Sequence, residues 1–204
     1  MTVNGYMLVG WQEIGGKWYL FSGAGAMQTG WARVGQTYCY FDGNGVMQTG
    51  WQEIDGKWYY FNGDGEMLTG LRKIGGRYFD LGGDGVMQKG WQKIDGKWYY
   101  FDNQGAAVTG WTKIGGNWYY MDEQTGAMKT GWQQVGNKWF YLEGDGVMKT
   151  GWFKWKDNWY YFLSSTGEMA TGWWKIGEGK LYNFDKNGVM IAEWEAVNGS
   201  WRKK

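Results

Sequence analysis

The feature that most constrains this chain is a block of about 20 residues that recurs along nearly its whole length. The stretch "DGKWYYFNGDGEMLTGL" (55–71) returns with small changes as "DGKWYYFDNQGAAVTGW" (95–111) and "GNKWFYLEGDGVMKTGW" (136–152). One residue is added in "DEQTGAM" and in "LSSTGEM". A Gly-Trp pair marks the copies at Trp11, Trp31, Trp51, Trp91, Trp111, Trp132, Trp152 and Trp173. A fixed short period predicts a stack of similar structural units, each of which contacts only its neighbours.

Each repeat is predicted to form one β-hairpin. In "WQEIDGKWYYF", two segments rich in aromatic residues flank an Asp-Gly pair, which favours a two-residue type I′ turn. That turn places Trp51 opposite Tyr60. Because opposed and alternate residues share a side of a hairpin, Trp51, Trp58 and Tyr60 are expected on one face, and Tyr59 and Phe61 on the other.

A lone hairpin is marginally stable in water, whereas stacked hairpins can bury a continuous apolar face. We therefore predict an all-β fold, an elongated solenoid of about nine hairpin repeats. Residues 1–10 match the tail of a truncated repeat, 11–191 form the tandem repeats, and 192–204 form a degenerate terminal half-repeat. Because the chain begins inside a repeat, it is expected to be a piece of a longer protein with a partner module upstream.

Composition excludes several classes of function. The net charge is +1, which gives no reason to expect nucleic acid or an anionic membrane as a partner. No apolar run approaches the roughly 20 residues that a membrane span needs, and no signal peptide opens the chain. Without histidine, no His-based metal site or catalytic pair can form. The acidic residues lie in turns at the repeat period, so we expect no catalytic residues, metal or cofactor. The single cysteine, Cys39, is expected to be a buried small hydrophobe.

The face with two tryptophans per repeat is expected to be partly wet, because the residue two positions after each Gly-Trp also lies there and is charged or polar, as Glu53 and Lys93 are. The aromatic side chains either form only the core of the stack or line repeated ligand pockets. Aromatic rings attract quaternary ammonium groups such as choline through cation–π interactions. Carbohydrates, which stack on Trp, are the alternative. A carbohydrate site needs fixed polar residues for the sugar hydroxyls, but the residue two positions after each Gly-Trp varies among Glu, Arg, Lys and Gln, which suits that task poorly.

The repeat "GWQEIDGKWYYFNGDGEMLTG" (50–70) resembles the choline-binding, or cell-wall-binding, repeat of Gram-positive surface proteins, autolysins and phage lysins. The resemblance covers nearly the entire chain. It implies a non-catalytic module that binds choline or phosphocholine on teichoic acids, secreted and attached non-covalently to the cell wall or cell surface, with no membrane insertion. It also allows a homodimer and a catalytic domain elsewhere in the parent chain. Related repeats bind glucans or the glycan receptors of toxins, which keeps the carbohydrate alternative open.

In that family a site forms between consecutive hairpins, from two tryptophans of one and a tyrosine of the next, often with a methionine nearby. The implied complete cages are Trp11, Trp18 and Tyr40; Trp91, Trp98 and Tyr120; Trp111, Trp118 and Tyr141; and Trp132, Trp139 and Tyr161. A variant cage consists of Trp31, Tyr38 and Tyr60.

Other repeats depart from the family pattern. Two sites are expected to be weak or damaged, since Asp80 would face Trp51 and Trp58, and Asn183 would face Trp152 and Trp159. The fourth repeat, with Leu71 and Tyr78, is expected to bind weakly or not at all. The methionines of the linkers are expected to pack chiefly in the core.

Overall fold

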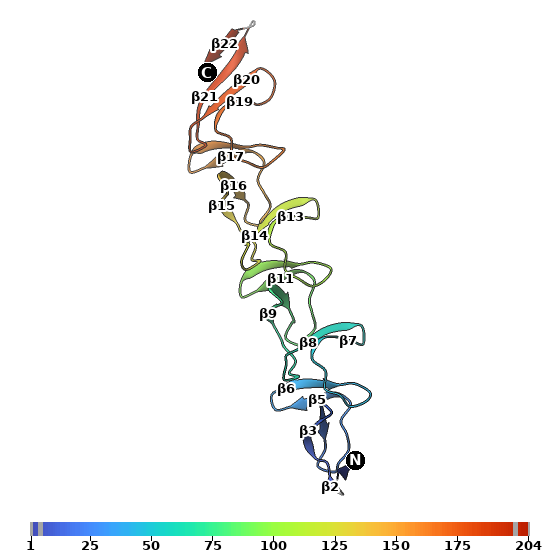
Figure 1. The fold of residues 1–204 in the computed structure, drawn as a ribbon. Helices are drawn as coiled ribbons and strands as arrows, with labels where there is room; N and C mark the ends of the chain where they lie inside the picture. Colours follow the sequence, from blue (N-terminus) through green and yellow to red (C-terminus); the bar gives the residue numbers. More distant parts are fainter. Residues whose placement is uncertain (1, 4–5, 198–199, 204) are drawn as a thin grey trace. The chain divides into compact units, whose positions relative to one another are not determined.

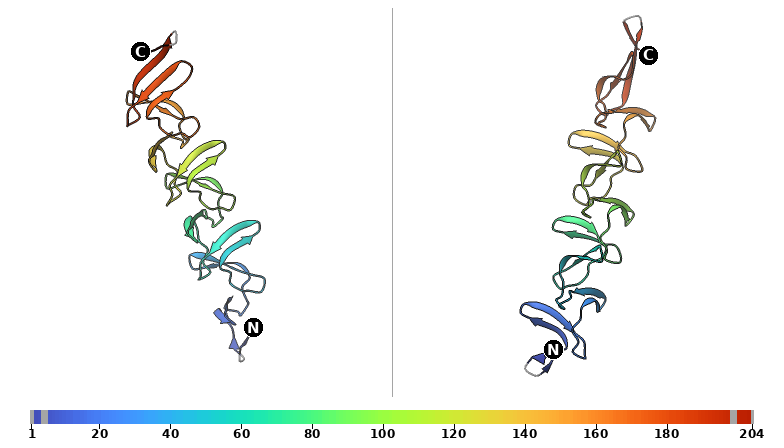
Figure 2. Two further views of the ribbon diagram at one scale, coloured as in Figure 1. Left: turned by 45° about the horizontal axis from the view of Figure 1, so that its top comes forward. Right: turned by 90° about the vertical axis from the view of Figure 1, so that its right-hand side faces the viewer.

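A computed structural model describes residues 2–3, 6–197 and 200–203 of the chain. All regular structure in these ranges is β, and no helix in them has the length and hydrophobicity to cross a membrane. The chain divides into two compact units, Met1–Ala107 and Val108–Lys204, within which the hairpins follow one another in chain order (Figures 1 and 2). The predicted all-β solenoid of hairpin repeats is confirmed.

In the first unit, antiparallel hairpins follow a short strand pair. The pairs are β1 (Thr2–Val3) with β2 (Tyr6–Met7), β3 (Gly10–Ile14) with β4 (Lys17–Phe21), β5 (Gly30–Val34) with β6 (Thr37–Phe41), β7 (Gly50–Ile54) with β8 (Lys57–Phe61), β9 (Leu71–Ile74) with β10 (Arg77–Asp80), and β11 (Gly90–Ile94) with β12 (Lys97–Phe101).

The second unit continues the pattern and ends in a larger sheet. Its hairpins are β13 (Gly110–Ile114) with β14 (Asn117–Met121), β15 (Gly131–Val135) with β16 (Lys138–Leu142), and β17 (Gly151–Trp155) with β18 (Asn158–Phe162). The four-stranded sheet has the order β19 (Gly172–Lys175), β20 (Lys180–Phe184), β21 (Met190–Val197) and β22 (Ser200–Lys203).

The hairpin turns have the backbone that the sequence predicts. Asp55 and Gly56 have φ angles of 51° and 72°, both positive as a type I′ turn requires. The resulting register pairs Trp51 with Tyr60, which is also as predicted.

Each hairpin has two different faces. In β7–β8 the front face carries Trp51, Trp58 and Tyr60, with the ring centroid of Trp51 6.4 Å from that of Trp58 and 5.1 Å from that of Tyr60. The back face carries Tyr59 and Phe61. Most other hairpins repeat these two faces, with a Trp-bearing front and a smaller aromatic back, whereas β9–β10 has Leu71 and Tyr78 in place of the two tryptophans.

Consecutive hairpins within a unit stack front to back. The front-face Trp31 of β5–β6 lies 4.9 Å from Tyr59 and 5.7 Å from Phe61, both on the back face of β7–β8. Trp152 of β17–β18 packs in the same way on Tyr182 and Phe184 of the last sheet. This contact buries the apolar surface that a lone hairpin leaves in water.

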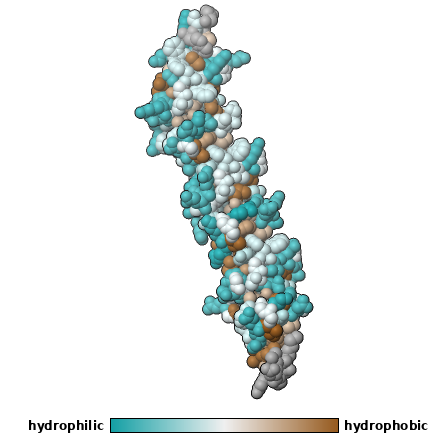
Figure 3. Space-filling model, viewed as in Figure 1, coloured by the Kyte–Doolittle hydropathy of each residue, from teal (hydrophilic) through white to brown (hydrophobic). Residues whose placement is uncertain are grey.

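Burial along the array is uneven. The last aromatic of the second strand is fully buried in most repeats, as at Phe41, Phe61, Phe101 and Phe162. The second tryptophan of each front face stays exposed. On the face drawn in Figure 3, polar residues separate smaller hydrophobic patches.

The linker after each hairpin ties it to the hairpin before. The backbone N–H of Met87, which follows β10, donates to the carbonyl of Trp58 in β8 at 2.8 Å. The Met87 side chain reaches the next turn, where a Cβ on Gly105 would clash with its sulfur. Because Gly105 also has a φ of +80°, both the contact and the backbone require glycine. The same arrangement recurs at Gly45, Gly65, Gly85, Gly146, Gly167 and Gly188.

In the longer repeats, the extra residue is accommodated in the turn after the second strand. In the shorter repeats this turn closes over three residues, as in the 2.9 Å hydrogen bond from Gly105 N–H to the Asp102 carbonyl. After β14 it closes over four residues, from Gly126 N–H to the Asp122 carbonyl at 2.8 Å.

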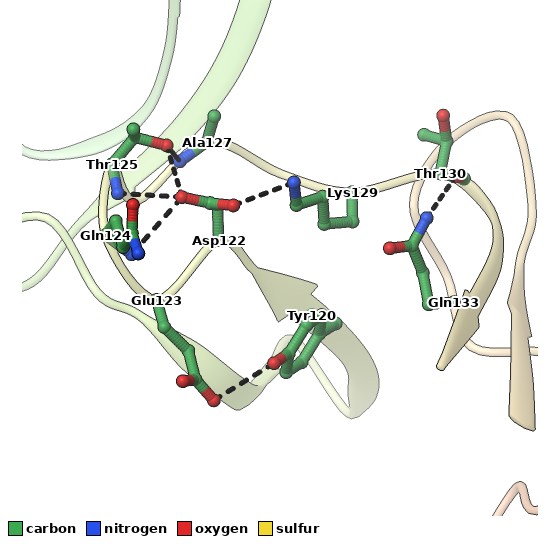
Figure 4. A network of polar contacts seen from close by, with 9 residues as sticks. All are labelled: Tyr120, Asp122, Glu123, Gln124, Thr125, Ala127, Lys129, Thr130 and Gln133. Atoms are coloured by element: carbon green, nitrogen blue, oxygen red, sulfur yellow. Dashed lines mark hydrogen bonds and ion pairs between the residues drawn. The ribbon is translucent and has the colours of Figure 1, made fainter. Parts of the chain in front are cut away.

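Side chains stabilise this wider turn (Figure 4). The Asp122 carboxylate accepts hydrogen bonds from the amide and hydroxyl of Thr125, each at 2.8 Å, and pairs with Lys129 at 2.7 Å. Lys129 first, and then Thr125, hold the pKa of Asp122 well below its usual range. Beside it, the Tyr120 hydroxyl donates to Glu123 at 3.0 Å. Burial, followed by this hydrogen bond, raises the pKa of Tyr120.

The segment predicted as a degenerate half-repeat lies largely in the four-stranded sheet. β21 pairs with β20 on one side and β22 on the other, in place of a further separate hairpin. The rings of Trp173 and Trp194 meet edge to face at 6.2 Å on this sheet.

Candidate ligand-binding site

Two tryptophans form a corner on the front face of most hairpins. In β7–β8 the rings of Trp51 and Trp58 are inclined at 71°, and in β17–β18 the rings of Trp152 and Trp159 are inclined at 88°. The second ring of each pair is exposed, by 38% for Trp58 and 43% for Trp159. Such a corner presents aromatic surface to both solvent and ligand.

The back face of the next hairpin supplies a third aromatic wall. Phe79 lies 4.9 Å from Trp51, with the rings inclined at 63°. The equivalent contacts are Phe140 on Trp111, Tyr160 on Trp132, and Tyr182 on Trp152, at 4.7, 5.0 and 4.7 Å.

This geometry corrects the third wall that the family resemblance implied. The tyrosines expected there lie one residue later, on the front face, each against the first tryptophan of its own hairpin. These contacts are Tyr40 with Trp31, Tyr60 with Trp51, Tyr120 with Trp111, Tyr141 with Trp132, and Tyr161 with Trp152, at 5.0 to 5.4 Å. Because hairpins stack front to back, the wall that meets a tryptophan pair comes from the back face of the next hairpin.

The front-to-back stacking also gives a different third wall to the two sites that were expected to be damaged. Asp80 is 7% exposed, and its carboxylate accepts a hydrogen bond from Gly82 N–H at 3.0 Å. Phe79 stands beside the tryptophan pair in its place. At the other site Asn183 lies opposite Trp173 within the last sheet, and Tyr182 forms the wall. Both sites therefore have three aromatic walls.

Cavities open at four of these corners, and each also has a methionine in its lining. They are the β7–β8 site (Trp51, Trp58, Phe79, Met87), the β13–β14 site (Trp111, Trp118, Phe140, Met148), the β15–β16 site (Trp132, Trp139, Tyr160, Met169) and the β17–β18 site (Trp152, Trp159, Tyr182, Met190). Their volumes are 460, 260, 380 and 340 Å³, close to the lower end of the range for small-molecule sites.

The methionines pack in the core, as expected, and some also line the cavities, where the family resemblance implied a nearby methionine. Met87 fills the space over Gly105 and also lines the β7–β8 site. Its polarizable thioether is suited to contacts with aromatic rings and with an apolar ligand.

The first repeat has a different third wall. Trp11 and Trp18 form the usual corner, with centroids 6.3 Å apart and rings inclined at 81°. The repeat position that holds Tyr59 or Phe79 elsewhere is occupied by Cys39, which is 1% exposed, as predicted for this residue. Burial, and secondarily the charge of Glu66, raises the pKa of the Cys39 thiol.

The second repeat keeps three rings but replaces a tryptophan. Trp31 and Tyr38 meet at 6.5 Å and 84°, so the corner is preserved with a smaller ring. Tyr59 forms its third wall at 4.9 Å from Trp31.

Two further repeats remain predictions as binding sites. In the fourth repeat the Lys73 ammonium lies over the ring of Tyr78, 5.4 Å from its centroid, where it competes for that ring face. In β11–β12, Trp91 and Trp98 form a corner with centroids 6.2 Å apart. The cage expected from this pair and Tyr120 draws on both units.

Besides the back-face aromatics, another lining residue that was not predicted from the sequence is Trp155. Trp155 lies 5.7 Å from Trp132 and lines the β15–β16 site, giving it a fourth aromatic wall. It occupies the end of the first strand, where other repeats have Ile or Val. This replacement of Ile or Val by Trp was the signal in the sequence that could have indicated a lining residue. The Lys156 ammonium lies over the Trp155 ring, 4.5 Å from its centroid.

The cavities differ in charge. Arg77 and Lys89 line the β7–β8 site, whereas Glu193 lines the β17–β18 site. There the Tyr182 hydroxyl donates to the Glu193 carboxylate at 3.2 Å. Burial first, and then this carboxylate, raise the pKa of Tyr182.

The site as a whole is a repeated aromatic box. The described residues contain no cluster of three or more Cys, Asp or Glu side chains that could hold a metal ion. Its chemistry is that of cation–π attraction and apolar contact. A family model for the choline-binding repeat matches residues 8–48, 29–70, 88–130 and 129–174.

The chain belongs to the choline-binding repeat family.

Solved choline-binding proteins share its fold. Choline binding protein F from Streptococcus pneumoniae is 30% identical with a TM-score of 0.70, covering 96% of this chain and 92% of that one. CbpJ from the same organism is 30% identical with a TM-score of 0.68, covering 90% and 88%. The choline-binding domain of pneumococcal CbpL is 29% identical with a TM-score of 0.65, covering 90% and 97%. Comparison with curated protein sequences gives no match. This array of choline-binding repeats is accordingly a choline-recognising binding module.

Proposed function

We propose that this module anchors its parent protein to the cell wall by binding the phosphocholine of teichoic acids, without catalysis. Each ligand lies between two hairpins, in a box made by the front-face tryptophan pair of one, a back-face aromatic of the next, and a linker methionine. The observation that carries this proposal is the β7–β8 site, where Trp51, Trp58, Phe79 and Met87 line one cavity.

The chemistry of these walls suits a trimethylammonium group. Such a group has no hydrogen-bond donor, so walls without acceptors leave nothing unsatisfied. Each ring face contributes cation–π attraction of about 0.5–2 kcal/mol. Burial of the methyl groups adds roughly 25 cal/mol per Å² of apolar surface. The three rings and the thioether supply both the cation–π attraction and the apolar contact.

Repetition supports attachment to a polymer. The front-to-back box recurs in both units, so several weak sites lie on one chain. When one site holds a repeating polymer, the effective concentration of the next ligand at the neighbouring site is high, and avidity exceeds the affinity of any single site. This favours a cell-surface location, where the ligand is itself a repeating polymer.

Titration with choline tests the proposal. We expect millimolar choline to change tryptophan emission, to raise the melting temperature because only the folded state has the boxes, and to elute the protein from a quaternary-amine resin. If choline has no effect while dextran or a galactoside raises the melting temperature, the boxes bind carbohydrate.

A site count separates binding rings from core rings. Trp118→Ala removes an exposed wall of the β13–β14 site, so equilibrium dialysis should find about one choline site fewer than in the parent protein. Trp174→Ala is the matched control, since Trp174 is also exposed but its indole N–H donates to the Thr171 carbonyl, and it lines none of the four cavities. An unchanged count in Trp118→Ala would mean that the ring serves packing alone.

A further inference from the structure

Charged side chains in the lining differ among the boxes: the basic Lys186 in the β15–β16 site, the acidic Glu193 in the β17–β18 site, and two bases in the β7–β8 site. The lining of the β7–β8 site includes Arg77 from β10 and Lys89 from the following linker. The β13–β14 site has no charged residue in its lining, and its Ser165 and Thr166 take the places of Asn103 and Gln104 in the β7–β8 site. Two cations beside an aromatic box repel a ligand that is only a cation. They favour a ligand that carries a negative group next to its ammonium.

Arg77 lines the cavity and has hydrogen-bond donors left for such a group. One guanidinium nitrogen donates to the Asp102 carboxylate at 2.8 Å, which fixes the side chain and offsets part of its charge. A guanidinium has five N–H donors, and this bond occupies one side of it. Lys89, two residues after the cavity-lining Met87, adds a second, exposed positive charge. Arginine binds phosphate through its planar fork and lysine as a point charge.

An acidic residue lies on the same face of the hairpin as the tryptophan pair, outside the residues that line the cavity. Glu53 is directly opposite Trp58 across the β7–β8 ladder, so it shares the front face with the tryptophan pair. Its carboxylate attracts the ammonium end of a ligand. The cavity is thus lined by bases from the next hairpin and linker, and the acid stands outside this lining on the face that bears the tryptophans.

We propose that the β7–β8 site binds phosphocholine as a zwitterion, with the ammonium between Trp51, Trp58 and Phe79 and the phosphate on Arg77 and Lys89. This inference rests on the proposed choline-binding function and names the form of the ligand that one site prefers. The β17–β18 site has the opposite preference, because the Glu193 carboxylate in its lining, whose charge Lys180 offsets in part from 3.5 Å away, repels a phosphate and attracts an ammonium. The two sites provide an internal comparison.

Indole N–H signals in NMR titrations report each site separately. The signals of Trp58 and Trp159 are assigned by Trp58→Phe and Trp159→Phe, and choline and phosphocholine are added at constant ionic strength. At Trp58 we expect phosphocholine to bind about 3- to 10-fold more tightly than choline, and at Trp159 less tightly than choline. Equal affinities of the two ligands at Trp58 would overturn the inference.

Removal of the two bases should shift the two ligands in opposite directions. In Arg77→Gln/Lys89→Gln, phosphocholine should bind the Trp58 site more weakly, whereas choline should bind more tightly because repulsion is relieved. Lys17→Gln/Lys97→Gln removes the same charge from exposed positions that line none of the four cavities, and should leave the ratio unchanged. If both ligands weaken together in the first variant, Arg77 and Lys89 only support the fold and the inference is wrong.

The outcomes separate this inference from the proposed function. If neither ligand moves any indole signal, the proposed function fails. If choline moves the signals but the Trp58 site shows no preference for phosphocholine, only the present inference fails. Phosphocholine is carried by wall polymers and by phosphatidylcholine. If the protein sediments with purified cell walls and not with phosphatidylcholine vesicles, the wall polymer is the source of the phosphocholine. If it sediments with the vesicles, the lipid is a source. Sedimentation with neither contradicts recognition of phosphocholine.

Discussion

The front-to-back assignment of the third wall can be tested with two adjacent residues. Phe140 and Tyr141 are neighbours in β16 but lie on opposite faces of the hairpin. Phe140 packs on Trp111 at 4.7 Å and lines the β13–β14 site. Tyr141 packs on Trp132 of its own hairpin at 5.4 Å. We therefore expect Phe140→Leu to weaken choline binding at the β13–β14 site and Tyr141→Leu to leave that site unchanged.

The size of the effect follows from what leucine removes. Leucine keeps an apolar side chain at this buried position but has no ring face, so the site loses one cation–π contact of about 0.5–2 kcal/mol. At 1.4 kcal/mol for each factor of ten, the dissociation constant should rise about 2- to 30-fold. The loss of the aromatic pair with Trp111 should also cost about 0.5–1.5 kcal/mol of stability.

Choline titrations followed by indole N–H signals measure each site in both variants. The signal of Trp118 reports the β13–β14 site and that of Trp139 reports the β15–β16 site. Melting curves of both variants confirm that the protein stays folded under the titration conditions. If Tyr141→Leu raised the dissociation constant at Trp118 and Phe140→Leu did not, the third wall would come from the front face, and the stacking described here could not be correct.

Three further predictions concern stability and reactivity. Gly65→Ala should lower the melting temperature, because Gly65 has a φ of +75° and a Cβ there meets a methionine sulfur, whereas Gly63→Ala in the same turn should change it little, since a Cβ there meets nothing within 4 Å. The folded-state pKa of Asp122 is below its unfolded value, so its pair with Lys129 should stabilise the fold at pH values above the unfolded pKa. This stabilisation should be lost as the pH falls toward the folded pKa. Asp122→Asn should abolish that part of the pH dependence of the melting temperature. Cys39, which is buried and has a raised pKa, should react with iodoacetamide much more slowly in the folded protein than in guanidinium chloride, and equal rates would contradict its burial.

The hairpins and their faces could be predicted because they depend on local sequence. The Asp55-Gly56 turn fixes which residues face each other, and alternation fixes the side on which each lies. The structure has that register. Nothing beyond one repeat is needed for this step.

The third wall could not be predicted with the same security, because it depends on how one hairpin rests on the next. The family pattern indicated Tyr60 and its equivalents. The predicted faces were a signal against this choice. Tyr60 lies on the front face beside the tryptophan pair of its own hairpin, so it cannot also face the preceding pair when hairpins stack front to back. A second signal was present as well: the earlier position is aromatic at Phe79 and Tyr182, where the later position holds Asp80 and Asn183.

The turn that accommodates an extra residue after β14 has a consequence for changes in chain length. Phe101 bridges to Ala107 in a shorter repeat, and Met121 bridges to Met128 in a longer one. The added residue therefore lies inside the loop that this bridge closes. A one-residue insertion within a strand would instead turn every later side chain to the opposite face of the hairpin. The loop after the second strand thus accommodates one added residue without a change of register, as the turn between β19 and β20 also does in the last sheet. Because Ser165 and Thr166, in the loop after β18, line the β13–β14 site, a reactive label attached there would keep the strands in register and stand beside a bound ligand.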